Sequence, residues 1–355
     1  MTIFLFVTGL AFLIVGAEAL VRGASRISSY FGVTPLVIGL TVVAFGTSAP
    51  ELAVSVNSAL SGQANIALGN VIGSNIFNIL FILGLSALIT PLVITQQLIR
   101  LDVPLLIVLS ITVLVLSLDG LISRLDGILL FSILVIYLGF LIFQGRRENA
   151  GMNKVDVQED GAGNGSLAYI FKNSGLILGG LVLLVIGSRW LVESAVYFAQ
   201  FFGVSDLVIG LTIVAAGTSM PEVVTSIVAA VRGERDIAVG NVIGSNIFNL
   251  LGVLGLAGII APGGIDVASS IITFDLPVMI AVALACLPIF FTGGTISRYE
   301  GAVLIGYYII YSIYLVLAAS HHDALPKYSA TLLYFILPLT ALVLMILVVQ
   351  QIRRH

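Results

Sequence analysis

The sequence predicts an all-α polytopic membrane protein, in which two inverted repeats of five transmembrane helices form a core and one extra transmembrane helix follows at the C-terminal end. Three observations lead to this fold class: the composition, the apolar runs and an internal duplication. Of the 355 residues, 59% are hydrophobic and only 9% are charged, whereas soluble domains carry about 25% charged residues. A mean hydropathy of +1.16 therefore indicates a protein whose solvent is the bilayer.

Apolar runs long enough to cross about 30 Å of hydrocarbon, at about 1.5 Å per residue, recur from one end of the chain to the other. Backbone amides cannot stay unpaired in lipid, so each run is expected to be a helix. The predicted spans are 2–27, 33–58, 66–90, 102–119, 124–144, 171–200, 204–230, 237–261, 275–292, 297–318 and 328–350.

The basic residues predict how these helices are oriented. With the N-terminus outside, only three of the 15 lysines and arginines, Arg124, Arg189 and Lys327, lie on the outer side. The other twelve gather at cytoplasmic helix ends and loops, where positive charge is normally enriched. We therefore expect a multi-pass protein of the cell membrane with its N-terminus outside and its C-terminus in the cytoplasm.

Composition also excludes several classes of function. The net charge of −3 is too small to indicate a nucleic-acid partner. The three histidines, His321, His322 and His355, all lie near the C-terminus, and Cys286 is the single cysteine. Haem ligation and histidine-based catalysis within the membrane therefore lack their usual residues, and we expect no cofactor.

The chain contains an internal duplication, which aligns with itself without a gap. A shift of 171 residues aligns 32–84 with 203–255, and 33 of these 53 positions are identical. Weaker matches on both sides extend each unit to five predicted helices, and an odd number of crossings inverts the second unit, as in many secondary transporters. The predicted organisation is a first repeat over 1–144, a cytoplasmic linker over 145–170, a second repeat over 171–318, and an extra C-terminal helix within 319–355.

The first polar motif of the repeat runs from Gly46 to Glu51 and recurs from Gly217 to Glu222. A proline within a helix leaves the carbonyl four residues earlier without its N–H donor, and a glycine at that position lets the helix unwind. Gly46, Pro50, Gly217 and Pro221 are therefore expected to break the two helices. The hydroxyls expected beside the glutamates are those of Thr47, Ser48, Thr218 and Ser219.

The second motif, Gly69 to Asn78, recurs residue for residue as Gly240 to Asn249. Asn70, Ser74 and Asn78 are four residues apart and form a polar stripe along an otherwise apolar helix, with Asn241, Ser245 and Asn249 as the equivalent stripe. Asn75 and Asn246 point away from the stripes and are expected to bond to neighbouring helices.

The residue types in these motifs indicate a site for a hard cation. A carboxylate near the middle of the bilayer costs about 2.5 kcal/mol or more, and Glu51 and Glu222 would repel each other unless a cation or proton lay between them. Oxygen ligands without Cys or His favour Ca²⁺, Na⁺ or Mg²⁺. The alternative for each Ser, Thr or Asn alone is an ordinary hydrogen bond between helices.

The two motifs resemble the α-1 and α-2 repeats of the cation/calcium exchanger superfamily, in particular its prokaryotic sodium/calcium exchangers. The resemblance implies that Glu51 and Glu222 are the central Ca²⁺ and Na⁺ ligands. It adds oxygens of Thr47, Ser48, Thr218 and Ser219, and flanking ligands from Ser74, Asn78, Ser245 and Asn249. It also implies alternating access, in which the first and sixth helices slide against the others.

Asn249 departs from the family pattern, because members often have Asp at this position. The predicted site therefore has one acidic residue fewer.

The expected function is a secondary antiporter that exchanges Na⁺ for Ca²⁺. The alternatives are exchange of H⁺ or of another divalent cation and, in another class, a passive cation channel. An intramembrane protease is disfavoured because neither glutamate has a positioned nucleophile or a paired Asp, so we expect no enzyme. The sequence predicts no oligomeric state.

Overall fold

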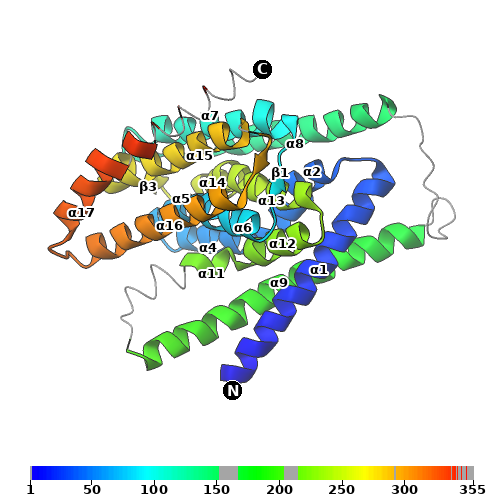
Figure 1. Ribbon diagram of the computed structural model, residues 1–355, viewed down its shortest axis with the longest axis horizontal. Helices are drawn as coiled ribbons and strands as arrows, with labels where there is room; N and C mark the ends of the chain where they lie inside the picture. The colour runs from blue at the N-terminus through cyan, green and yellow to red at the C-terminus, as the bar shows by residue number, and fades with distance from the viewer. Residues whose placement is uncertain are drawn as a thin grey trace.

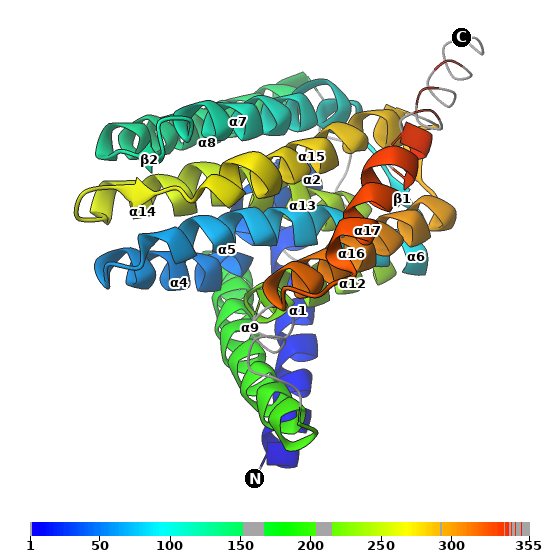
Figure 2. The same ribbon diagram turned by 90° about the vertical axis from the view of Figure 1, so that its left-hand side faces the viewer.

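The computed structural model describes residues 2–151, 167–203, 215–291, 293–336 and 338–340, with positions 342, 345 and 349. Most of the predicted linker, the start of the predicted span 204–230 and most of the last predicted span beyond residue 340 lie outside these residues. Within them the protein is almost entirely helical, and Figures 1 and 2 show most helices stacked in layers.

Eight helical segments among the described residues are long and apolar enough to cross a membrane, which confirms a polytopic membrane protein. They match eight of the predicted spans. They are formed by α1 (Thr2–Phe31), α5 (Ala64–Phe77) with η2 (Asn78–Leu83) and α6 (Gly84–Ile89), η3 (Leu98–Asp102) with α7 (Val103–Leu116), α8 (Arg124–Gly151), α9 (Leu167–Phe201), α13 (Arg235–Phe248) with η5 (Asn249–Val253) and α14 (Leu254–Ile260), η6 (Ile271–Asp275) with α15 (Leu276–Phe291), and α16 (Arg298–Ala319).

The predicted span 33–58 is broken rather than straight. It consists of α2 (Pro35–Ile38), η1 (Gly39–Val43) and α3 (Ala44–Thr47), followed after a 47° bend by α4 (Ala49–Leu60). In the second half, α11 (Ala215–Thr218) is followed in the same way by α12 (Met220–Val231). Each break falls on a serine, Ser48 or Ser219, and the proline occupies the second position of the next helix, where its missing N–H costs nothing.

Gly46 and Gly217 lie in the helical segments before the breaks. A Cβ added to Gly46 would lie 2.4 Å from Leu181 Cδ2 of α9, and one added to Gly217 would lie 2.4 Å from Val192 Cγ2. The glycines therefore let both broken helices approach α9, while the chain bends two residues later.

The two longest helices, α1 and α9, cross each other and project beyond the layered bundle (Figure 2). Their contact follows glycines seven residues apart. A Cβ on Gly9 would lie 2.9 Å from the carbonyl oxygen of Gly187, and one on Gly16 would lie 2.8 Å from that of Gly180. Side chains at these positions would separate the two backbones, so the sequence spacing dictates a close helix pair.

Contacts between the two halves of the chain also hold the rest of the bundle together. The span Arg235–Ile260, which contains α13, is the innermost, with 83% of its apolar window buried, whereas Arg298–Ala319 has only 6% buried and forms the periphery. Strand β1 (Leu92–Val93) pairs antiparallel with β4 (Thr295–Ile296), and β2 (Leu121–Ile122) with β3 (Ile265–Asp266). Each small sheet joins a loop of the first half to a loop of the second.

The last predicted span, 328–350, is represented by α17 (Leu325–Thr331) and the short η7 (Leu332–Ile336). Tyr328 donates a hydrogen bond of 2.9 Å to the backbone oxygen of Ile310 in α16. The described part of the C-terminal segment therefore packs on the periphery of the bundle.

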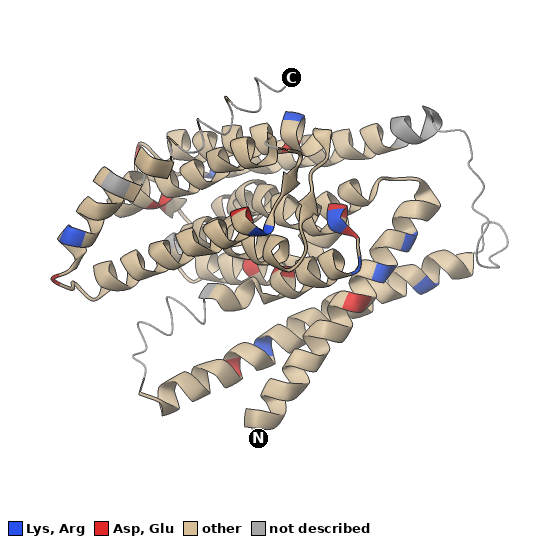
Figure 3. Cartoon of the chain, in the orientation of Figure 1, with Lys and Arg blue, Asp and Glu red and all other residues tan. Residues whose placement is uncertain are grey.

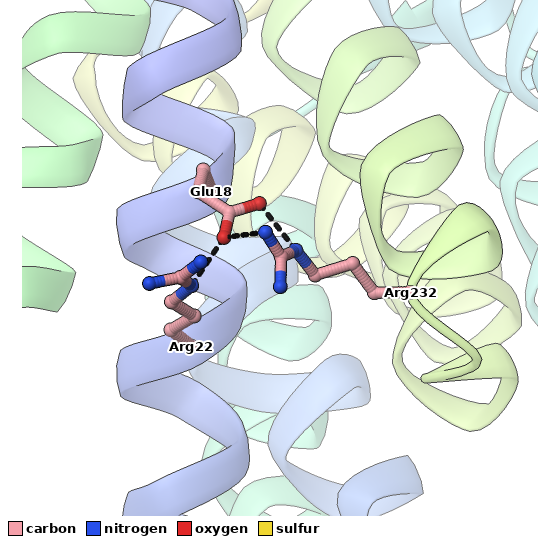
Figure 4. Close-up of polar contacts among 3 residues, drawn as sticks. All are labelled: Glu18, Arg22 and Arg232. Carbon is pink, nitrogen blue, oxygen red and sulfur yellow. Dashed lines mark hydrogen bonds and ion pairs between the residues drawn. The ribbon is translucent and has the colours of Figure 1, made fainter.

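Charged residues are sparse along the ribbon (Figure 3). Glu18 of α1 forms ion pairs with Arg22 on the same helix and with Arg232, beyond the end of α12, and Arg232 also donates a hydrogen bond to it (Figure 4). Ser25 donates to Glu234 at 2.6 Å in the same region. These contacts tie α1 to the turn between α12 and α13.

Candidate cation site

Glu51 and Glu222 occupy the first turns of α4 and α12, and each is only 1% exposed. The positive end of each helix dipole favours a carboxylate at this position. Each glutamate is held by the other half of the chain: Ser219 Oγ donates to Glu51 Oε1 at 2.7 Å, and Ser48 Oγ donates to Glu222 Oε1 at 2.9 Å. The two helix breaks therefore meet, and the four residues form one buried cluster.

No basic residue neutralises this cluster in the part of the chain that the structure describes. The ion pairs there involve Glu18 and Glu193, and neither Glu51 nor Glu222 takes part in one. The Oε2 atoms of both glutamates are buried and have no hydrogen-bond partner. Since an unpaired buried carboxylate is strongly unfavourable, the arrangement requires a positive charge.

Neutral oxygens without a hydrogen-bond partner accompany these two carboxylate atoms. They belong to residues that the sequence predicts as ligands, and they are Thr218 Oγ1, Ser245 Oγ, Asn78 Oδ1 and Asn249 Oδ1. Buried polar atoms are normally paired, so these unpartnered oxygens are free to act as ligands. Hard cations such as Ca²⁺ bind six to eight oxygens of these types.

Four asparagines cross-link α5 and its continuation η2 to α13 and its continuation η5. Asn75 and Asn246 each donate to the other's backbone oxygen at 3.3 Å, which confirms the expected contact between helices. Asn78 donates to Asn246 Oδ1 at 2.9 Å, and Asn249 donates to Asn75 Oδ1 at 3.2 Å. The amide nitrogens of Asn78 and Asn249 are thereby engaged, which leaves their Oδ1 atoms as the available ends.

The remaining predicted residues lie at the same place but differ in their contacts. Thr47 Oγ1 donates to Asn241 Oδ1 at 3.0 Å and to the Ala44 carbonyl at 3.3 Å. Ser74 Oγ accepts a weak bond of 3.4 Å from Ser219. The hydroxyls of Thr47 and Thr218, equivalent in the repeat, are thus used differently.

Ser188 of α9 has a role that the sequence does not reveal. Its hydroxyl donates to the carbonyl oxygen of Gly217 at 2.7 Å, so this carbonyl, expected beside the glutamate, is already paired. A residue with this role is hard to find from the repeat, because Ala17 occupies the equivalent position in the first half.

The cluster is rich in oxygen ligands. The described residues contain no group of three or more His, Cys, Asp or Glu side chains that could hold a metal. The cluster offers two carboxylates surrounded by hydroxyl and amide oxygens, which is the donor set of Na⁺ and Ca²⁺. Fold and site together define a polytopic membrane protein with a buried cluster of acidic and neutral oxygens.

The chain belongs to the sodium/calcium exchanger protein family, whose model matches residues 1–143 and 172–317. This confirms the family resemblance of the two motifs. The family consists of transporters, and it includes proteins that span the membrane many times, as this chain does.

Relatives match over nearly the whole chain. CaxA of Alkalimonas amylolytica is 40% identical over 319 residues, covering 88% of this chain and 98% of that protein. The sodium/calcium exchanger MaX1 of Methanosarcina acetivorans is 35% identical over 342 residues, which cover 86% of this chain and 96% of that protein. A solved structure of the sodium-calcium exchanger NCX_Mj, soaked with 10 mM Na⁺ and no Ca²⁺, is 31% identical, covers 87% of this chain and 97% of its own, and superposes with a TM-score of 0.74.

Proposed function

We propose that this protein is a secondary antiporter that exchanges Na⁺ for Ca²⁺ across the cell membrane, without a cofactor. One observation supports this most strongly: Glu51, Glu222, Thr218, Asn78 and Asn249 each have a buried side-chain oxygen without a hydrogen-bond partner. Names of similar proteins, among them MaX1 and NCX_Mj, point to the same two ions.

The two carboxylates explain why the two ions would be exchanged rather than co-transported. Together they offer a charge of −2, which either one Ca²⁺ or two Na⁺ would neutralise. Ions that compete for the same charge cannot occupy it at once, so the site moves one kind in each direction. Thr47, Ser48, Ser219, Ser74 and Ser245 would contribute further oxygens as the cage adapts to each ion.

Two inverted repeats of five spans, 1–144 and 171–318, would surround this site, with the linker between them and the helix within 319–355 outside the duplication. The pairing of β1 with β4 and of β2 with β3 supports this symmetry, because the duplication relates one sheet to the other. The glycine-lined pair of α1 and α9 would slide against the other helices to expose the site alternately, with the N-terminus outside and the C-terminus in the cytoplasm.

Uptake of ⁴⁵Ca²⁺ into Na⁺-loaded proteoliposomes tests the proposal. We expect uptake that depends on the outward Na⁺ gradient and is abolished in Glu51→Gln. Glu193→Gln is the matched control, because Glu193 is half-exposed and pairs with Arg189 of its own helix. Uptake without a Na⁺ gradient, or normal uptake in Glu51→Gln, would rule the proposal out, and flux that does not saturate would indicate a channel.

Exchange of H⁺ for Ca²⁺ is the second candidate. It is favoured by the absence of any basic partner for the two glutamates among the described residues, because two protons would neutralise them equally well. Replacing the Na⁺ gradient by a pH gradient in the same vesicles separates the two candidates.

A further inference from the structure

Asn70 of α5 bridges α5 to the first turn of α4. Its Nδ2 group donates to the backbone oxygen of Glu51 at 3.3 Å and to Ser55 Oγ at 3.0 Å. An asparagine amide has two N–H donors, and here both hold the same short stretch of α4. Asn70 is therefore bonded to the backbone of a site residue and not to its carboxylate.

Asn241 makes the same two contacts in the second half of the chain. Its Nδ2 group donates to the backbone oxygen of Glu222 at 3.4 Å and to Ser226 Oγ at 2.9 Å. The two halves thus repeat not only the asparagine but also both of its acceptors. Such repetition indicates a function common to both copies of the motif.

This function follows from where the glutamates lie. Each glutamate comes three residues after a helix break, at Ser48 or Ser219, so its first turn is not fixed by a continuous helix on both sides. The next helix along the chain bears Ser74 and Asn78 in the first half, and Ser245 and Asn249 in the second. A bond from Asn70 or Asn241 to the glutamate backbone sets the distance between the carboxylate and those oxygens.

Asn241 has one contact more than Asn70. Its Oδ1 atom accepts a hydrogen bond of 3.0 Å from Thr47, whereas the equivalent Thr218 hydroxyl has no partner. Asn241 is also completely buried, and Asn70 is partly exposed. Asn241 therefore joins α3, α12 and α13, including segments from both halves of the chain.

We propose that Asn70 and Asn241 are positioning residues, which hold the backbones of Glu51 and Glu222 so that both carboxylates converge on the bound cation. This inference rests on the proposed function. The two residues do not bind the ion themselves. Their loss weakens the binding of both Ca²⁺ and Na⁺, because both ions use the same carboxylates. Asn241 has the larger effect because it also fixes Thr47.

The test measures the affinities of the purified, detergent-solubilised full chain for Ca²⁺ and for Na⁺ by titration calorimetry, together with the melting temperature without ions. We expect Asn241→Ala to weaken both affinities about tenfold, as the loss of one or two buried hydrogen bonds would, and Asn70→Ala to do so less. Ser226→Ala, which leaves the bond to the Glu222 backbone in place, should have a smaller effect than Asn241→Ala. Asn57→Ala, at an exposed position of α4, is the matched control.

Three outcomes would overturn the inference. An unchanged affinity with a lowered melting temperature would show that the asparagines only support the fold. A weaker affinity for one ion alone would show that the asparagine binds that ion directly. A change in affinity no larger than that of Asn57→Ala would show that it has no role. If Asn241→Ala does not fold, Asn70→Ala tests the same claim through Glu51. Failure of the proposed function itself would appear differently, as absence of Na⁺-dependent Ca²⁺ transport in the unmodified protein.

Discussion

Ser219 donates a hydrogen bond of 2.7 Å to Glu51, which lies 168 residues away in the other half of the chain. The reciprocal bond from Ser48 to Glu222 is 2.9 Å long. Each acid is therefore oriented by the helix break of the opposite half, and neither half contains a complete site. The duplication produces one shared site and not two independent ones.

Removal of this serine should weaken cation binding. In Ser219→Ala, Glu51 loses its closest donor and the cage loses one oxygen, so we expect the Ca²⁺ concentration for half-maximal uptake to rise about tenfold. Initial rates of Na⁺-driven ⁴⁵Ca²⁺ uptake measure this. Ser132→Ala, on an exposed face of α8, is the control, and an identical dependence in the two variants would contradict the shared site.

The charge of the cage should determine how many Na⁺ ions are exchanged. Asn249→Asp changes the charge of the predicted ligands from −2 to −3. The new oxygen replaces the Nδ2 group that donates to Asn75, beside an Oδ1 atom that has no partner. We expect exchange that moves more Na⁺ per Ca²⁺ or becomes inhibited by acid, as a proton fills the third charge. The Na⁺:Ca²⁺ ratio and the pH dependence of uptake, compared with those of the unmodified protein, measure the change. If neither differs, residue 249 lies outside the cage.

Two Asp–Tyr pairs that differ in burial should differ in their contribution to stability. The Tyr137 hydroxyl donates to Asp102 at 2.9 Å, where Asp102 is completely buried, and Tyr311 donates to Asp275 at 3.4 Å, where Asp275 is partly exposed. We expect Tyr137→Phe to destabilise the protein by about 1–3 kcal/mol, since a buried carboxyl group loses its partner. Tyr311→Phe should destabilise the protein less. Thermal unfolding of the two variants measures this, and equal losses would contradict the difference in burial.

The contact between Glu18 and Arg232 should affect transport more than stability. Such partly exposed ion pairs are worth about 1 kcal/mol or less, but this one ties α1 to the turn after α12 (Figure 4). If α1 slides during transport, the contact must break, so Arg232→Gln should exchange ions faster, and high salt should reduce the difference by screening. Arg189→Gln is the control, because its ion pair lies within α9. Equal rates for the two variants would show that the contact does not restrain transport.

Polarity within the membrane made much of this architecture predictable. Buried polar groups are costly in lipid, so the duplicated motifs stand out in the sequence, and eight predicted spans agree with helices of the structure. The contact of Asn75 with Asn246 was also predictable, because both residues point away from the polar stripes.

Contacts between distant segments were not predictable in the same way. Spacing along a helix placed Ser48 beside Glu51, but in the structure Ser48 bonds to Glu222, because the two helix breaks face each other. Spacing likewise predicted an unwound helix at Gly46, whereas the bend falls at Ser48 and the glycine accommodates α9. The four strands, of two residues each, are too short to leave a pattern in the sequence.

Competition between Na⁺ and Ca²⁺ for the purified protein tests the central claim most directly. The measurement is equilibrium binding of ⁴⁵Ca²⁺ at increasing Na⁺, in the unmodified protein and in Glu51→Gln and Glu222→Gln. A single cage shared by both ions predicts that Na⁺ raises the apparent dissociation constant of Ca²⁺ without changing the number of sites, and that either substitution abolishes binding. Ca²⁺ binding that is indifferent to Na⁺, or that persists unchanged in both variants, would contradict the account.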